Sequence, residues 1–243
     1  MATTDLSSLT EETEDTSVAP TGASETALVV TQGAVPGVSG AVGKEDIVVP
    51  RLNVVQKMSD KFIDLGFNAG DVVYAQEVLF ANTSKVGNLT VVGVFVQYQQ
   101  VLPYGGDVLP KVVNTIEEVI ANGGSTTIGA PNEYSKIATI TGLIEAPEDI
   151  SDAHESFFPL EFEGKLYSMA KWTVAKTAFR DVAKPLLTQA MMFARNGGIF
   201  SIKYQLSTKK STNGTNSWYS PVLKQVGRHT PEFTEFAAQF AGQ

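Results

Sequence analysis

Apolar and polar positions alternate over short runs through most of the chain after its first 45 residues, and this pattern predicts β-strands. The runs are rich in valine and isoleucine and are bounded by turn residues such as Gly70 and Asn88. We expect strands over Ile47–Gln56, Val72–Phe80, Leu89–Tyr98, Ser135–Ile144, Phe157–Phe162 and Leu166–Ala170. Residues 103–132 lack the pattern, so we interpret them as an excursion from the sheet that carries a short helix over residues 112–121.

The period then becomes helical, which predicts one main helix over Val174–Arg195 with Thr173 as its N-cap. Apolar residues spaced by three or four form one stripe: Phe179, Val182, Leu186, Ala190 and Phe193. Cations spaced by four form a basic ridge on another face: Lys176, Arg180 and Lys184. Pro185 lacks a backbone donor and should kink or split this helix, and Asn196-Gly197-Gly198 should end it.

Two strands and a short helix are predicted to close the fold. The strands are expected over Ile199–Ser207 and Ser217–Val226, joined by a polar loop over Thr208–Asn216 that is too long for a tight hairpin. Asn213-Gly214 supplies the turn within that loop. The final helix is expected over Pro231–Phe240, with its phenylalanines on one face.

This order of elements predicts a mainly β fold with α additions (α+β). We expect an elaborated, OB-fold-like, five-stranded Greek-key barrel formed by residues 46–243 as a single globular domain, with the main helix before the closing hairpin. Residues 1–45 contain no aromatic residue and are dominated by small and polar residues, which predicts a disordered, acidic and Gly-rich arm. Such an arm is either a simple linker or a mobile acidic segment that docks on partners or competes for a basic groove.

Charge is distributed unevenly along the chain. The formal net charge is −8, yet residues 164–229 contain eleven Lys and Arg residues against one anion, Asp181. Both tryptophans of the chain and three of its tyrosines lie in the same segment. Cations interleaved with aromatic rings suit single-stranded nucleic acid, because the charges follow the phosphates while the rings stack on bases. The alternative is a solvated basic face whose aromatic residues belong to the core.

The candidate nucleic-acid-binding residues are cations and aromatic residues from the predicted helix and closing strands. They are Lys171, Trp172, Lys176, Arg180, Lys184, Lys203, Tyr204, Lys209, Lys210, Trp218, Tyr219 and Lys224. Trp218 and Tyr219 are adjacent, and adjacent residues of a strand point to opposite faces. At most one of the two can therefore stack on a base from a given sheet face, and we expect at least one to pack inward.

Several function classes are excluded or disfavoured. The chain has no cysteine, which excludes disulfides, thiol catalysis and cysteine-based zinc sites. His154 and His229 are far apart in the sequence, and the hydrolase, zincin and dinucleotide-binding motifs are absent. We therefore expect no enzymatic activity, metal or cofactor. The amino terminus lacks the cations of a secretory signal, and no apolar run approaches the ~20 residues of a membrane span. These features favour the cytoplasm and a protein that does not bind membranes.

Five short stretches resemble a group of bacteriophage proteins that includes single-stranded DNA-binding proteins. They are Val49–Gln56, Gly70–Tyr74, Val91–Phe95, Thr177–Lys184 and Ser217–Tyr219, and the resemblance spans about residues 47–240. It implies an OB-type fold and single-stranded DNA binding in phage replication or recombination, within the host cytoplasm. Such proteins often end in an acidic tail, whereas this chain ends in Phe240-Ala241-Gly242-Gln243. If an acidic arm recruits replication or recombination proteins here, as the resemblance implies, it is the amino-terminal one.

Two other functions remain compatible with the sequence. A virion structural or assembly protein would also combine a polar arm with an acidic, β-rich domain. A protein inhibitor or adaptor acting on a host protein is the third hypothesis. Oligomeric state, including a homo-oligomer, is left open by the sequence.

Overall fold

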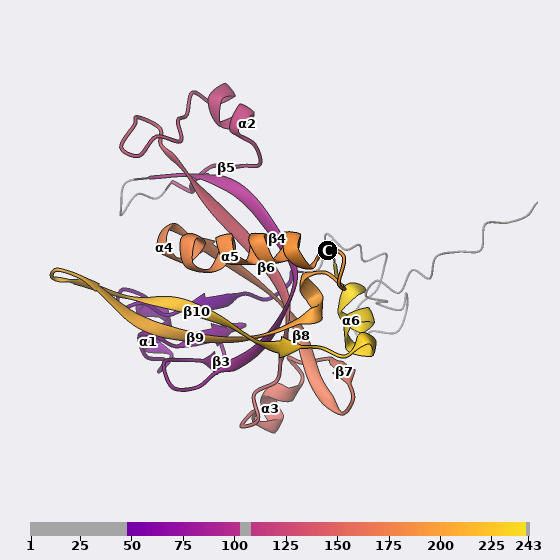
Figure 1. The fold of residues 1–243 in the computed structure, drawn as a ribbon. Coiled ribbons are helices and arrows are strands. Elements are labelled where there is room, and N and C mark those ends of the chain that lie inside the picture. Colours follow the sequence, from indigo (N-terminus) through magenta and orange to yellow (C-terminus); the bar gives the residue numbers. More distant parts are fainter. Residues whose placement is uncertain (1–47, 103–107, 242–243) are drawn as a thin grey trace, which may run out of the picture.

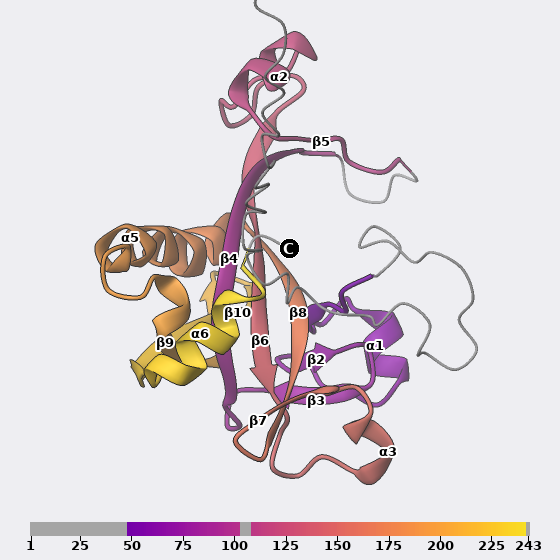
Figure 2. The same cartoon turned by 90° about the vertical axis from the view of Figure 1, so that its right-hand side faces the viewer.

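The structure is a computed structural model that describes residues 48–102 and 108–241. The predicted arm over residues 1–45 lies outside the described residues. The described chain forms two antiparallel sheets with a few helices around them (Figures 1 and 2). This confirms the α+β class.

The smaller sheet is a meander of three short strands in the order β1-β2-β3. These are β1 (Leu52–Val54), β2 (Val72–Tyr74) and β3 (Val78–Ala81), and α1 (Asp60–Asp64) lies between the first two. The strand predicted over Val72–Phe80 is divided because Ala75 and Gln76 adopt positive φ angles of 52° and 66° and reverse the chain. Two consecutive left-handed residues without glycine leave no turn signal in the sequence.

The larger sheet has seven strands in the order β10-β9-β4-β6-β8-β7, with β5 paired to β4. The strands are β4 (Gly87–Gln100), β5 (Val112–Val113), β6 (Tyr134–Glu145), β7 (Leu160–Phe162), β8 (Lys165–Ala175), β9 (Ile202–Asn213) and β10 (Asn216–Arg228). The predicted strands over Leu89–Tyr98 and Ser135–Ile144 are confirmed as β4 and β6, which form the centre of this sheet. Both are Val- or Ile-rich, as expected of strands buried between neighbours.

The five-stranded Greek-key barrel is not confirmed, because the described strands form two sheets and no closed barrel. Backbone hydrogen bonds help to join the two sheets. Arg51, next to β1, forms an isolated backbone β-bridge with Lys171 of β8, and the Lys171 N–H donates to the Pro50 carbonyl over 2.9 Å. Beyond the end of β3, the Asn82 carbonyl accepts from the Thr208 N–H of β9 over 3.1 Å. The main core lies between the two sheets and the main helix.

The main helix is confirmed, but it begins later than predicted and is irregular. β8 continues to Ala175, so Thr173 lies in a strand and the predicted N-cap is wrong. The helix comprises α4 (Lys176–Ala178), a π-helical stretch over Phe179–Ala183 and α5 (Lys184–Phe193). The predicted interruption by Pro185 takes this π-helical form, since proline cannot donate to the preceding turn. A 3₁₀ turn over Ile199–Ser201 then leads into β9.

The predicted polar loop over Thr208–Asn216 is wrong. β9 and β10 remain paired from Thr208 and Pro221 outward, and only Gly214 and Thr215 form the turn. Gly214 has a φ of 59°, which glycine adopts without strain. The outer part of this ribbon is polar because solvent covers it, so apolar alternation could not mark it as strand.

The final helix is confirmed as α6 (Pro231–Ala238), whose first turn is capped by Thr230 Oγ1 accepting from the Phe233 N–H over 3.2 Å. Phe233, Phe236 and Phe240 pack in one aromatic group, as their spacing predicts. The remaining short helices are α2 (Ile116–Ala121) and α3 (Asp152–Glu155).

The predicted excursion is also confirmed as a lobe, which we define as residues 108–133. Figure 2 shows β5 and α2 at the far end of β4 and β6, away from the smaller sheet. The lobe has a small core of its own, in which Val113 and Val119 pack against Tyr98 and Tyr134 of the long strands.

Candidate nucleic-acid interface

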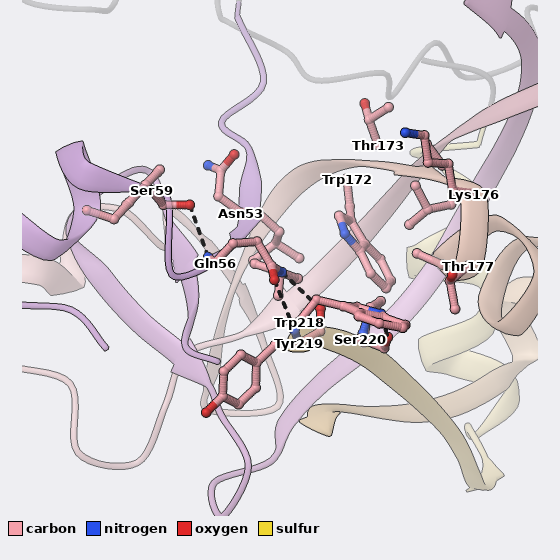
Figure 3. Close-up of a pocket in the computed structure, with 17 residues that line it drawn as sticks. Asn53, Gln56, Ser59, Trp172, Thr173, Lys176, Thr177, Trp218, Tyr219 and Ser220 are labelled. Carbon is pink, nitrogen blue, oxygen red and sulfur yellow. Dashed lines mark hydrogen bonds between the residues drawn. The ribbon is translucent and has the colours of Figure 1, made fainter. Parts of the chain in front are cut away.

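A groove opens where β1 and β8 diverge beyond the bridge between Arg51 and Lys171 (Figure 3). It has a volume of about 540 Å³ and is lined mainly by residues 52–54 of β1, 172–178 of β8 and α4, and 218–221 of β10. Three parts of the chain that are distant in sequence therefore form it together. Its volume falls within the range of about 300–1,000 Å³ that is usual for ligand sites.

One side of the groove is held by a side-chain amide that makes the pair of hydrogen bonds a neighbouring β-strand would make. Gln56 Nε2 donates to the Tyr219 carbonyl over 2.9 Å, and the Tyr219 N–H donates to Gln56 Oε1 over 2.9 Å. The Gln56 N–H in turn donates to Ser59 Oγ over 3.0 Å. This pair of hydrogen bonds ties the chain after β1 to β10 and fixes the width of the groove at that side.

The β8 side presents backbone groups. The Lys171 N–H points away from β6, because it donates to the Pro50 carbonyl. Peptide groups alternate along an antiparallel ladder, and the pairing of β8 with β6 has no bulge, so the N–H and C=O groups of Thr173 and Ala175 point the same way. Backbone N–H groups on this edge are suitable donors to phosphate oxygens.

Lys176 stands at the end of β8, where the strand turns into α4. Its φ is 50°, so a residue with a side chain occupies the left-handed region, at a cost on the order of 1 kcal/mol. Its side chain is exposed, and Figure 3 shows it on the same rim of the groove as Thr173. The groove lining contains no carboxylate, and Lys176 is the one charged residue among the described residues that line it. The one charged side chain of the described groove lining is therefore a cation.

The aromatic residues of the groove have different environments. Trp172 is only 4% exposed and belongs to the core, so it offers an edge rather than a free face. Trp218 is half-buried, and its Nε1–H donates to Ser220 Oγ over 2.9 Å. The Tyr219 ring packs on Gly70, where an added Cβ would lie 2.6 Å from the ring. Figure 3 shows the Tyr219 ring directed away from Trp172 and Trp218, as the alternation along a strand predicts.

The basic ridge and the apolar stripe of the main helix are confirmed. Phe179, Val182 and Leu186 are buried, whereas Arg180 and Lys184 are exposed together with Lys176. The list of predicted site residues that line the groove is Trp172, Lys176, Trp218 and Tyr219.

The helix also approaches the closing hairpin. Arg180 Nε donates to Asp181 Oδ1 over 2.7 Å, and this contact, with a smaller contribution from Lys209 of β9, holds the pKa of the Asp181 carboxyl below its usual range. Arg180 is therefore paired with a carboxylate at the start of the main helix. Lys210 is exposed beside Lys209.

Other predicted site residues lie elsewhere. Tyr204 is 1% exposed and donates to Gln189 Oε1 over 2.6 Å, and burial raises its pKa to about 12. It is a core residue without a free face for a base, which corrects its prediction as a stacking residue. Lys203 lies close enough to His229 to help lower the pKa of that imidazole, and Lys224 is exposed on β10. Lys171 contributes its backbone to the junction of the two sheets.

A model of the Pam3 phage gp34-like protein family matches residues 21–243, which is most of the chain. The chain belongs to this family. As a Pam3 phage gp34-like protein it is a phage protein, which confirms the bacteriophage part of the prediction and leaves single-stranded DNA binding as a prediction. No curated protein and no solved structure matches the chain. Within the described part of this Pam3 phage gp34-like protein, no helix is long and apolar enough to cross a membrane.

Three groove residues of this family member were missed by reasoning from the sequence. All three are neutral polar residues: Asn53 and Gln56 lie in the stretch interpreted as a strand and as part of the resemblance, and Ser59 lies just after it. Uncharged side chains that bind backbone or ligand have no compositional signature. The one local signal is that the polar run after Val55 interrupts an otherwise apolar strand.

Proposed function

We propose that this phage protein binds single-stranded DNA without sequence specificity, and that it protects the strand during replication or recombination. The observation that carries the proposal is the composition of the groove. It combines an exposed lysine, a half-buried indole and outward-facing backbone N–H groups in one lining without a carboxylate.

Each of these groups suits one part of a single strand. Lys176 and the N–H groups of Thr173 and Ala175 are donors to phosphate oxygens. Trp218 can stack on an unpaired base, a contact that tolerates any base because every base has a π-face. The bases of a duplex are already stacked on one another, so this groove favours a single strand over a duplex.

The surrounding cations extend the interaction. Arg180 and Lys184 are exposed on the helix that begins at the groove, and Lys209 and Lys210 are exposed on the hairpin next to it. We propose that four to six phosphates contact this surface, each contributing ~0.7 to the dependence of log affinity on log salt.

The test is a salt titration of binding to a fluorescent oligo(dT) of about 20 nucleotides, followed by anisotropy. Affinity should fall by about 50- to 350-fold between about 50 and 200 mM salt, along a straight line in the logarithmic plot. An unlabelled duplex of the same length should compete less well than unlabelled single strand. Failure to bind the oligonucleotide at about 50 mM salt would refute the proposal, because the electrostatic attraction is strong there.

A further inference from the structure

A second cavity lies between the lobe and the main helix. We call it the lobe cavity, and it has a volume of about 440 Å³. It is lined in part by Tyr98 and Tyr134 of the long strands, Ile128 of the lobe, and three lysines, Lys136, Lys176 and Lys184.

Lys176 lines both the groove and the lobe cavity, so the two are neighbours on the surface. The left-handed backbone at this residue places its side chain at the division between them. A polyanionic chain that leaves the groove past Lys176 therefore reaches the lobe cavity next.

Like the groove, the lobe cavity combines positive charge with aromatic side chains. Lys136 lies over the Tyr98 ring, with Nζ 5.7 Å from the ring centroid, so its charge is held at the cavity. Glu133 is the one carboxylate among the described lining residues, and its Oε2 accepts from the Gly129 N–H over 2.7 Å. The lining thus has an excess of positive charge.

The lobe contributes apolar surface that has no evident role within the fold. Ile128 is 90% exposed and Ile116 is 43% exposed, although both line the cavity. Branched apolar side chains left in water at a cavity with three lysines fit a ligand with flat apolar faces and a negative backbone. A single strand of DNA has both properties.

We infer that the lobe cavity is the second half of the binding path, and that single-stranded DNA continues from the groove past Lys176 into it. Ile116 and Ile128 then cover bases while Lys136 and Lys184 contact phosphates. This inference rests on the proposed function and adds to it the path that the DNA follows across the surface.

The test compares the full-length protein with a double variant, Ile128→Ser with Lys136→Gln. Both positions are exposed, so the fold should not depend on them. The probes are oligo(dT) of about 4 nucleotides, at the lower end of single-strand site sizes, and of about 20 nucleotides, which exceeds that range. Met191→Ser is the matched control, because Met191 is 82% exposed on α5 and lines neither cavity.

The double variant should bind the longer oligonucleotide at least about fivefold more weakly, with a salt dependence reduced by ~0.7, and the control should bind as the wild type does. The advantage of the longer oligonucleotide over the shorter one should shrink in the double variant. Unchanged binding of the longer oligonucleotide by the double variant would overturn the inference and leave the proposed function standing. Absence of binding by the wild type at low salt would overturn both.

Discussion

Lys176 offers a test in which stability and binding should move in opposite directions. It occupies the left-handed region with a φ of 50°, its side chain is exposed, and it lines both the groove and the lobe cavity. Lys176→Gly removes both the Cβ and the charge. If Lys176 served only to hold the fold, removing its side chain would lower the stability of the protein.

The expected gain in stability follows from the backbone conformation. The left-handed region costs about 1–2 kcal/mol for a residue with a Cβ, and glycine does not incur this cost. Glycine is more flexible in the unfolded chain, which costs about 0.4–1 kcal/mol. The variant should therefore be more stable by up to about 1.6 kcal/mol, and its melting temperature should rise by up to about 6 °C for a domain of this size.

The expected loss of binding follows from the charge. Removal of one phosphate contact should lower the dependence of log affinity on log salt by ~0.7, and affinity should fall most at low salt. The assays are thermal denaturation followed by circular dichroism and anisotropy with labelled oligo(dT). The Gly variant should thus be more stable and bind more weakly.

Two further variants separate the effects. Lys176→Asn keeps a side chain that tolerates the left-handed region while removing the charge, so it should weaken binding with little change in stability. Arg195→Gln removes an exposed cation that lines neither cavity, and binding should be nearly unchanged. A lower melting temperature for Lys176→Gly would refute the strain argument. Wild-type affinity in both Lys176 variants would place the cation outside the interface.

Other expectations follow from the same structure. Trp218→Ala should weaken DNA binding by ~1–3 kcal/mol without changing its salt dependence, whereas Trp172→Ala should lower stability by about 3–5 kcal/mol, as denaturant titration would show. Gln56→Ala breaks both hydrogen bonds to the β10 backbone and should cost about 1–3 kcal/mol in the same titration. Burial lowers the pKa of His229 to about 4, so the folded state favours the neutral imidazole. The free energy of unfolding should therefore be highest above about pH 6.5, and it should fall by at most about 3 kcal/mol as the pH drops through 4. His229→Gln should flatten that pH dependence of the melting temperature, and an equally steep profile would contradict the assignment. From the sequence, limited proteolysis should trim the chain to a stable core that begins near residues 40–47, and a core that retains the first 40 residues would disprove the predicted domain boundary.

Local patterns in the sequence were sufficient to predict the helices and strands whose buried face is visible in their own residue spacing. The stripe of Phe179, Val182 and Leu186 predicted which helix face is buried, and the spacing of Phe233 and Phe236 predicted the aromatic face of α6. The class of fold followed from these periods, because a strand or helix must bury one face whatever it packs against. Charge counting likewise located the cations on the surface, since burial of an unpaired charge is costly.

The arrangement of those elements was decided only by the tertiary structure. Tyr204 and Trp218 are both aromatic and lie in the same lysine-rich segment, yet one is a core residue and the other lines the groove. The difference depends on which neighbour covers each strand face, and those neighbours are distant in sequence. The extended ribbon beyond Thr208 was missed because a strand exposed on both faces has no apolar alternation.

The sequence by itself determined a β-rich phage protein with a basic, aromatic segment, and the tertiary structure decided where a ligand could bind. The groove exists because β1 and β8 pair at one bridge and then separate, while Gln56 holds β10 in place. Lys176 reaches its rim only because the backbone turns left-handed at the end of β8. Neither feature can be recognised from the local sequence. Strand divergence and a single strained torsion are set by the packing of segments more than a hundred residues apart. Periodicity shows only which face of one element is apolar.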